Sequence, residues 1–228
     1  MTSNLTRDEA AERARLLRVE SYQVELDLTG GETTFGSVTT VRFSCLRPGT
    51  ATFADLTAPG VSQIILNGSE LPASAFDGDR IALQALAGSN ELTVRAHCAY
   101  SRSGEGLHRF TDPADKAVYL YSDLETFEAH RIYACFDQPD LKATFELTVL
   151  CPDTWQVISN MAPTSPASQP GLAWSAGTSR RAHRCPPTSL ISPPGRTMSS
   201  AASMTAYRSA STAGSRWPAT LTPPRSSR

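Results

Sequence analysis

The sequence predicts an all-β fold, an antiparallel β-sandwich of two or three sheets, preceded by a short helix and followed by a disordered tail. Apolar and polar residues alternate with period two through much of residues 21–159, which is typical of half-buried strands. Turn residues separate these runs at short intervals, and helical periodicity is nearly absent after Arg18. We therefore divide the chain into a β domain at 1–160 and a tail at 161–228.

The first element is a short helix. Thr6 followed by Glu9 is a capping-box pattern that marks a helix start. The Ala-, Leu- and Arg-rich run that follows extends to Arg18. We expect this helix to place Leu16 and Leu17 against the body of the domain.

Strand patterns then recur along the chain, with turn signals between them. Asn67-Gly68 and Asp77-Gly78 are dipeptides of hairpin turns. Residues 104–106, with two glycines, are interpreted as a loop. The predicted strands are 22–28, 35–43, 51–56, 61–66, 80–86, 91–100, 117–121, 143–151 and 155–159.

The charge is divided unevenly along the 228 residues. Residues 1–153 hold 13 basic and all 22 acidic residues, a net charge of −9, and residues 154–228 carry +8. No run approaches the roughly 18 to 20 consecutive apolar residues of a membrane span, and residues 1–18 are charged rather than signal-like. We expect a cytoplasmic protein with no membrane partner.

The five cysteines are odd in number, widely spaced and without a Cys-x-x-Cys pair. This spacing favours neither a disulfide framework nor a zinc knuckle, so reduced structural thiols are expected. Cys135 has no base patterned near it and is interpreted as a small buried apolar residue.

The tail differs in composition from the rest of the chain. Its 68 residues include 14 Ser, 11 Ala and 10 Pro and no acidic residue, which is typical of disorder. A second origin is translation in the wrong frame. Suppose that the correct reading frame begins at the third base of each codon now translated. The DNA for Leu190 to Pro218 could then encode AHITAGPYDVVRSVDDGVPLGLYCRQSLA, which has the apolar runs, acidic residues and glycine turns of a folded protein. Both a frameshift and a real disordered basic tail stay open, and we expect no nucleic-acid partner.

The most informative segment is 104–150. It contains Gly-Leu-His-Arg-Phe at 106–110, Arg131 and Tyr133, Phe-Asp-Gln-Pro at 136–139, and Leu-Lys-Ala at 141–143. This order resembles the amino-terminal domain of the gluzincin aminopeptidases, that is, aminopeptidase N or alanyl aminopeptidase, especially from GC-rich bacteria. The similarity covers about the first 160 residues. The peptide permitted in the other frame also resembles what that family carries next.

The resemblance implies that the complete enzyme removes amino-terminal residues from peptides with one Zn²⁺. In that family a His-Glu-x-x-His helix and a later Glu bind the metal, and the first Glu activates the zinc-bound water. In this chain no two of the histidines, His97, His108, His130 and His183, are four residues apart. We therefore expect a chain cut off before its catalytic domain, with no catalytic residue, no metal site and no cofactor of its own.

The resemblance also implies one substrate contact. By register from Arg131, the position that binds the peptide α-amine in the family falls on Glu125, where a carboxylate would anchor the ammonium group. Two residues earlier the family has Gln where this chain has Asp123, which can accept but not donate hydrogen bonds. The alternative hypothesis is a stand-alone peptide- or protein-binding β module. The oligomeric state is left undetermined.

Overall fold

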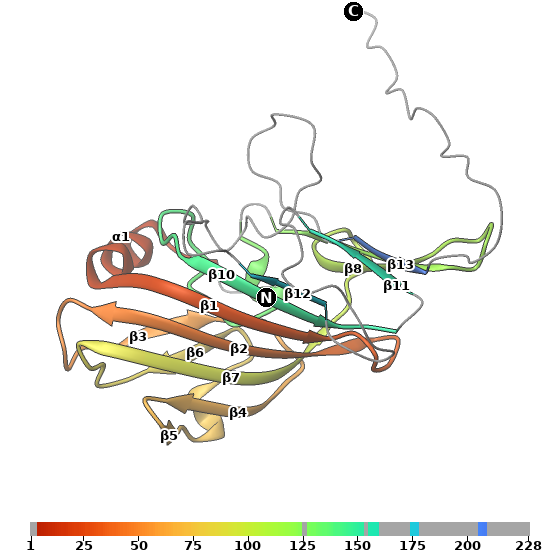
Figure 1. The fold of residues 1–228 in the computed structure, drawn as a ribbon. Coiled ribbons are helices and arrows are strands. Elements are labelled where there is room, and N and C mark those ends of the chain that lie inside the picture. Colours follow the sequence, from red (N-terminus) through yellow and green to blue (C-terminus); the bar gives the residue numbers. More distant parts are fainter. Residues whose placement is uncertain (1–3, 125–126, 153–154, 160–173, 178–204, 209–228) are drawn as a thin grey trace, which may run out of the picture.

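The computed structural model describes residues 4–124, 127–152, 155–159, 174–177 and 205–208, and confirms the all-β class (Figure 1). Within these ranges one α-helix, α1 (Arg7–Leu16), accompanies three sheets. The seven-stranded sheet is ordered β12 (Trp174–Gly177), β10 (Thr144–Leu150), β1 (Leu17–Asp27), β2 (Thr34–Cys45), β7 (Ser89–Ala99), β4 (Gly60–Leu66) and β5 (Ser69–Glu70).

The two smaller sheets complete the domain. The four-stranded sheet is ordered β11 (Trp155–Ile158), β13 (Thr205–Arg208), β9 (Val118–Asp123) and β8 (Gly106–Thr111). The two-stranded sheet pairs β3 (Thr52–Asp55) with β6 (Arg80–Leu83). Two 3₁₀ turns, η1 (Ala73–Ala75) and η2 (Ala129–Arg131), lie in the connections.

The predicted capping box starts α1. The Thr6 hydroxyl accepts a hydrogen bond from the Glu9 N–H at 3.3 Å, and the Glu9 carboxylate accepts one from the Thr6 N–H at 2.8 Å. The helix ends two residues earlier than the sequence predicts, because Leu17 already begins β1. Leu16 and Leu17 are both buried, as expected.

The seven-stranded sheet is antiparallel except at one place, where β1 and β10 run parallel. Tyr22 lies opposite Val41 on one side and Phe145 on the other. The alternation of buried and exposed residues is the same for either strand direction, so the sequence pattern could not reveal this exception to the antiparallel prediction.

Aromatic side chains pack between the sheet and the turns that follow β9. The rings of Tyr22 and Phe145 stack at 4.7 Å between centroids, and those of Phe43 and Phe136 meet edge to face at 5.0 Å. The Tyr22 hydroxyl accepts a hydrogen bond from the Phe136 N–H at 3.0 Å, so this buried phenol has a polar partner. The core thereby links the first strand to the 136–139 turn.

Four strands were not predicted from the sequence: the two-residue β5, and β8, β12 and β13. Gly106–Thr111 forms β8, although the sequence indicated a loop at its start; only Gly106 and Leu107 are buried, so it lacks a clear alternation. Strands β12 and β13 fall inside the segment expected to be disordered. Strand β12 pairs with β10, and β13 pairs with β9 and β11. The open edge of a sheet presents unpaired backbone groups that can bind such an extended segment.

The predicted turn at Asn67-Gly68 is confirmed. Both residues have positive φ, 53° and 81°, and they join β4 to the short β5. Positive φ at both central positions matches the right-handed twist of a hairpin, and Asn and Gly are the residues that tolerate it. Gly78, in the second predicted turn, also has positive φ, 109°.

Candidate functional site

The candidate site lies where β9 ends and the chain turns toward η2. Asp123 is the last residue of β9, is exposed, and stands opposite Gly106 of β8. Glu125, the second residue assigned to substrate binding, lies outside the described residues together with Thr126. The structure therefore places Asp123 at a strand end and does not test the position of Glu125.

The described residues on both sides of 125–126 are fixed by packing. Leu124 is buried at 1 % exposure, and Ala129 in η2 is fully buried. The rings of Phe127 and His130 are 4.5 Å apart between centroids. Leu124 and Ala129 thus belong to the core of the domain, and Phe127 packs against His130.

Arg131, a residue of the family motif, is held beside this segment by two carboxylates. Its Nε donates to Glu128, and its Nη2 lies 3.5 Å from the Glu105 carboxylate. No sequence pattern singled out Glu105 or Glu128. Gly106 lets Arg131 pack closely against β8, since a Cβ at Gly106 would lie 3.0 Å from the Arg131 Cβ and the glycine has a φ of +63°.

The chemistry that these side chains offer is binding and orientation. Carboxylates such as Asp123 and Glu105 accept hydrogen bonds and attract an ammonium group. A groove of about 420 Å³ adjoins Arg131 and Glu105 and is also lined by Tyr100, Arg102 and Leu107. Charges of both signs therefore lie near the end of β9.

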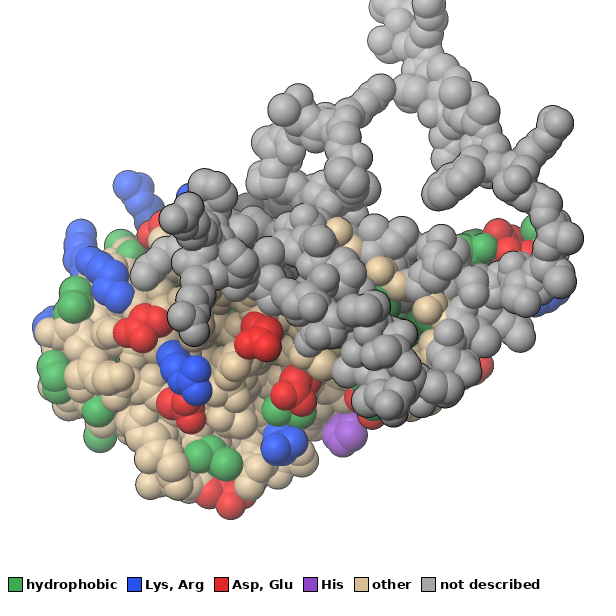
Figure 2. All heavy atoms as spheres, viewed as in Figure 1, with side chains coloured by type: hydrophobic (Ala, Val, Ile, Leu, Met, Phe, Trp, Pro, Cys, Tyr) green, Lys and Arg blue, Asp and Glu red, His purple; other side chains and the backbone are tan. Residues whose placement is uncertain are grey.

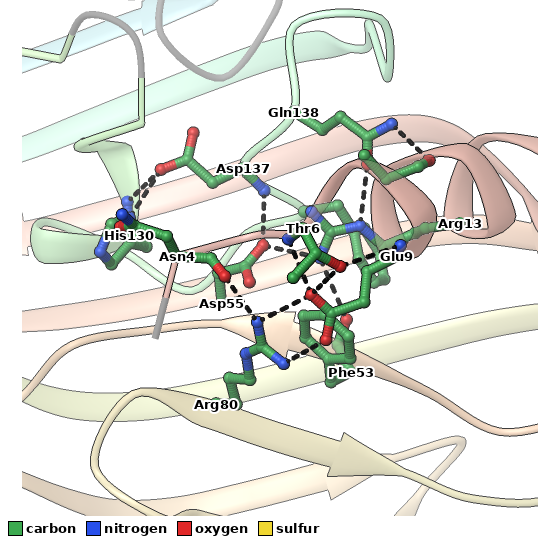
Figure 3. Close-up of polar contacts among 12 residues, drawn as sticks. Asn4, Thr6, Glu9, Arg13, Phe53, Asp55, Arg80, His130, Asp137 and Gln138 are labelled. Atoms are coloured by element: carbon green, nitrogen blue, oxygen red, sulfur yellow. Dashed lines mark hydrogen bonds and ion pairs between the residues drawn. The ribbon is translucent and has the colours of Figure 1, made fainter. Parts of the chain in front are cut away.

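The Phe-Asp-Gln-Pro motif at 136–139 holds parts of the domain together through the buried polar network shown in Figure 3. Asp137 Oδ2 accepts a hydrogen bond from the His130 N–H at 3.0 Å and lies 2.8 Å from His130 Nδ1. The Asp137 N–H donates to Asp55 Oδ2 at 2.9 Å. The motif thus ties η2, just after the candidate site, to strand β3.

Helix α1 joins the same network through Arg13, which is 2 % exposed. Arg13 Nη1 lies 2.7 Å from Asp55 Oδ2, and Arg13 Nε donates to Gln138 Oε1 at 3.0 Å. The Gln138 amide donates to the Ala10 carbonyl at 2.8 Å. Burial raises the pKa of the Asp55 carboxyl, and the Arg13 guanidinium opposes that rise.

The described residues do not offer a zinc site. Within the described ranges, no three His, Cys, Asp or Glu side chains come together as metal ligands. His130 is engaged by Asp137, and His108 Nδ1 accepts a hydrogen bond from the Gly104 N–H at 3.1 Å. His183 lies outside the described residues.

Of the helices that the structure describes, none is long and apolar enough to cross a bilayer.

The cysteines that the structure describes are buried free thiols, as the sequence predicts. They are Cys45, Cys98, Cys135 and Cys151. Burial raises the pKa of Cys98 to about 12 and that of Cys135 well above its usual range. A thiol kept protonated in this way is a poor nucleophile, which agrees with the structural role expected for Cys135.

Comparison with known proteins identifies the family. The family model of the Peptidase M1 N-terminal domain matches residues 20–175. The chain belongs to this family. The resemblance to the amino-terminal domain of the aminopeptidases is thereby confirmed, and the family match includes Asp123, Arg131 and the whole 136–139 motif.

Relatives extend the comparison. Aminopeptidase N of Streptomyces lividans is 52 % identical over 172 residues, covering 74 % of this chain and 20 % of that protein. Aminopeptidase N of Canis lupus familiaris is 25 % identical over 171 residues, 61 % of this chain and 16 % of that one. The structure of native yeast LTA4 hydrolase shares the fold, with a TM-score of 0.65 at 14 % identity, over 85 % of this chain and 29 % of that one. The chain spans a fifth or less of the two aminopeptidases.

Proposed function

We propose that this chain is the non-catalytic amino-terminal domain of a zinc metallo-aminopeptidase that removes amino-terminal residues from peptides, and that it holds the substrate's free amine. The observation that carries the proposal is the 52 % identity to Streptomyces lividans aminopeptidase N over 172 residues. The burial of Leu124 and of Ala129 supports it, since residues that position a substrate need rigid neighbours. The buried free thiols support a reducing, cytoplasmic location.

In this proposal Glu125, assisted by Asp123, accepts hydrogen bonds from the protonated α-amine of the peptide. Fixing the amine determines which peptide bond reaches the reacting centre, so the contribution is positioning rather than bond breaking. Zinc, bound by a part of the enzyme that lies beyond the segment matched here, would supply water activation. Because Asp123 is an acid, it can only accept hydrogen bonds at that position.

For the tail we propose a change of reading frame rather than a functional basic segment. The lack of any acidic residue after Asp153 supports a change of frame near or after Asn160. Reading the downstream DNA in all three frames tests this. An uninterrupted frame that encodes His-Glu-x-x-His is expected, and its absence from every frame would contradict the proposal.

The first test of function uses the purified chain, an alanyl chromogenic peptide substrate and added Zn²⁺. No turnover is expected, because the described residues form no zinc ligand set. Turnover that requires zinc and stops on chelation would refute the non-catalytic assignment. Saturable peptide binding by the chain alone, lost in Glu125→Ala, would instead favour the alternative of a stand-alone binding module.

The second test uses a chimera in which residues 20–175 of this chain replace the aligned segment of Streptomyces lividans aminopeptidase N. Glu125→Gln in this chimera should raise KM about tenfold to a hundredfold, which corresponds to one charged hydrogen bond of about 1.5–3 kcal/mol. The matched control is Glu32→Gln, since Glu32 is 83 % exposed. Equal KM values for the Glu125 variant, the control and the parent would remove the proposed role.

A further inference from the structure

The outer face of the seven-stranded sheet is not covered by another described layer. Along β1, β2 and β7 one set of side chains is buried in the core, and the alternate set faces outward. Figure 2 looks onto this outer face and shows acidic, basic and histidine side chains on it. Over residues 36–40 its middle is formed by the uncharged residues Gly36, Val38 and Thr40 of β2. The next outward residue of β2, Arg42, forms a salt bridge with Glu91 of β7 at 2.8 Å.

Charges of opposite sign lie on the two sides of β2. In one row across the sheet, Glu25 of β1, Val38 of β2 and Arg95 of β7 are neighbours. In the next row on the same face, Asp27, Gly36 and His97 are neighbours. Strands are about 4.8 Å apart, so each acidic side chain is separated from the basic one by about 10 Å of sheet. Among the described residues, Glu25, Asp27, Arg95 and His97 form no salt bridge within the chain, although the Asp27 carboxylate accepts hydrogen bonds from the Thr29 N–H and hydroxyl at 2.9 and 2.6 Å.

A hollow of about 470 Å³ lies between these two charged sides, and Thr148 and Leu150 of β10 help to line it. Gly36 keeps the hollow open, because it has no side chain and an added Cβ would lie 3.3 Å from the Asp27 Cβ. Val38, Thr148 and Leu150 are half-buried. An uncharged strip flanked by acidic residues on one side and by Arg95 and His97 on the other is a surface suited to a second protein surface.

We propose that two copies of this chain pack outer face against outer face, around a twofold axis that runs along β2. Such an axis exchanges the places of β1 and β7, so Glu25 lies over the partner's Arg95 and Asp27 over the partner's His97. The same contacts repeat on the other side of the axis, as in any isologous dimer. The charge pattern is therefore self-complementary, and this makes a second copy the occupant that the face fits.

Sheets that pack face to face lie about 10 Å apart, which the side chains of Arg95 and Glu25 can span together. The absence of a side chain at Gly36 leaves room for these long side chains to lean over the centre. A twofold axis along β1 or β7 instead of β2 would place Glu25 over the Glu25 of the second copy, or Arg95 over its Arg95, and like charges oppose association. The charges thus select one arrangement of the two sheets.

The test is sedimentation equilibrium of the full chain over a range of concentrations. The unaltered chain should show a monomer–dimer equilibrium. Glu25→Arg and Arg95→Glu should each raise the dissociation constant at least about tenfold, because each places like charges across the twofold axis. An equimolar mixture of the two variants should associate again, since both contacts between position 25 of one variant and position 95 of the other then join opposite charges.

Matched controls are Glu12→Arg and Arg47→Glu, which make the same charge changes at exposed positions away from this face, 73 % and 61 % exposed. Both should leave the dissociation constant unchanged. A chain that remains monomeric at every concentration, or variants whose mixture associates no better than each alone, would overturn the proposal. This result is independent of the proposed function, which involves the end of β9 rather than the outer face.

Discussion

The domain holds its charges in two different ways, at the α1–β3 junction and at the end of β9. At the junction, Arg13 and Asp55 are each 2 % exposed and pair with one another inside a network of hydrogen bonds. At the end of β9, Asp123 is exposed, and Arg131 keeps 32 % exposure beside Glu128 and Glu105. Removing one partner of a buried pair of the first kind leaves an uncompensated charge in the core, whereas the charged groups of the second kind stay in contact with solvent.

This difference separates the roles of residues that are close in sequence. Asp137 and Gln138 belong to the most recognisable motif of the chain, yet both are buried and bind other parts of the domain. Asp123 and Glu125 lie only a dozen residues earlier and belong to the proposed substrate contact. A strong motif therefore does not by itself mark the residues that meet the substrate.

The largest expected effect is at the junction. Arg13→Ala should lower the free energy of unfolding by about 3–5 kcal/mol, because it leaves the buried Asp55 carboxylate without its partner. Urea denaturation followed by circular dichroism measures this. The control is Arg42→Ala, whose pair with Glu91 is about half exposed and should contribute only about 0–1 kcal/mol. Similar losses of unfolding free energy in Arg13→Ala and Arg42→Ala would contradict the difference between the buried and the exposed pair.

A smaller effect is expected from Tyr22→Phe in the core next to the junction. Removing the hydroxyl leaves the buried Phe136 N–H without an acceptor, which should cost about 1–3 kcal/mol. Ring packing against Phe145 is retained, so the loss reports the hydrogen bond. The midpoint of thermal unfolding gives the measurement, and an unchanged midpoint would show that the bond contributes nothing.

Near the site, Gly106→Ala should destabilise by about 1–2 kcal/mol. The φ of +63° disfavours alanine, and the new Cβ would lie 3.0 Å from the Arg131 Cβ. Gly31→Ala is the matched control, because nothing lies within 4 Å of a Cβ at Gly31 and its φ is not positive. The comparison fails if both alanines change the free energy of unfolding equally.

The smallest expected effect is a change in pH dependence at the start of α1. The hydrogen bond from Arg80 and that from the Thr6 N–H lower the pKa of Glu9 from its ordinary 4.5 to about 2. A carboxylate whose pKa is lowered by folding stabilises the protein above pH 4.5, and this contribution is lost as the pH falls toward 2. Glu9→Gln should flatten the fall in stability over that interval, and a parallel curve would show that Glu9 does not contribute to it.

Much of the fold was predictable because strand burial leaves a local signal. Alternation located the central strands of the seven-stranded sheet, and the capping box located the start of α1. Strand direction was not predictable, since β1 and β10 have the same alternation in either orientation. Strand β8 escaped prediction because its last residues are exposed and its first lie in a glycine-rich turn.

The site was less predictable than the fold. Register along the motif placed Asp123, which the structure puts at the end of β9, and Glu125, which stays a prediction. The carboxylates that hold Arg131 were missed, because Glu105 is brought near Arg131 only when β8 pairs with β9. The Arg13–Asp55 pair joins residues 42 positions apart, and no local sequence pattern predicts such a contact.

The parallel pairing of β1 with β10 also governs the order in which the domain can be completed. Gln23 and Glu146, whose side chains are hydrogen-bonded across this pair, are separated by 123 positions. While the protein is being synthesised, β1 can join β2 early, but its other edge must wait for residues 144–150 to leave the ribosome. Contacts of such long range slow folding, and an open strand edge favours aggregation during the delay. The pairing of β1 with β10 can thus form only after most of residues 1–150 have been synthesised.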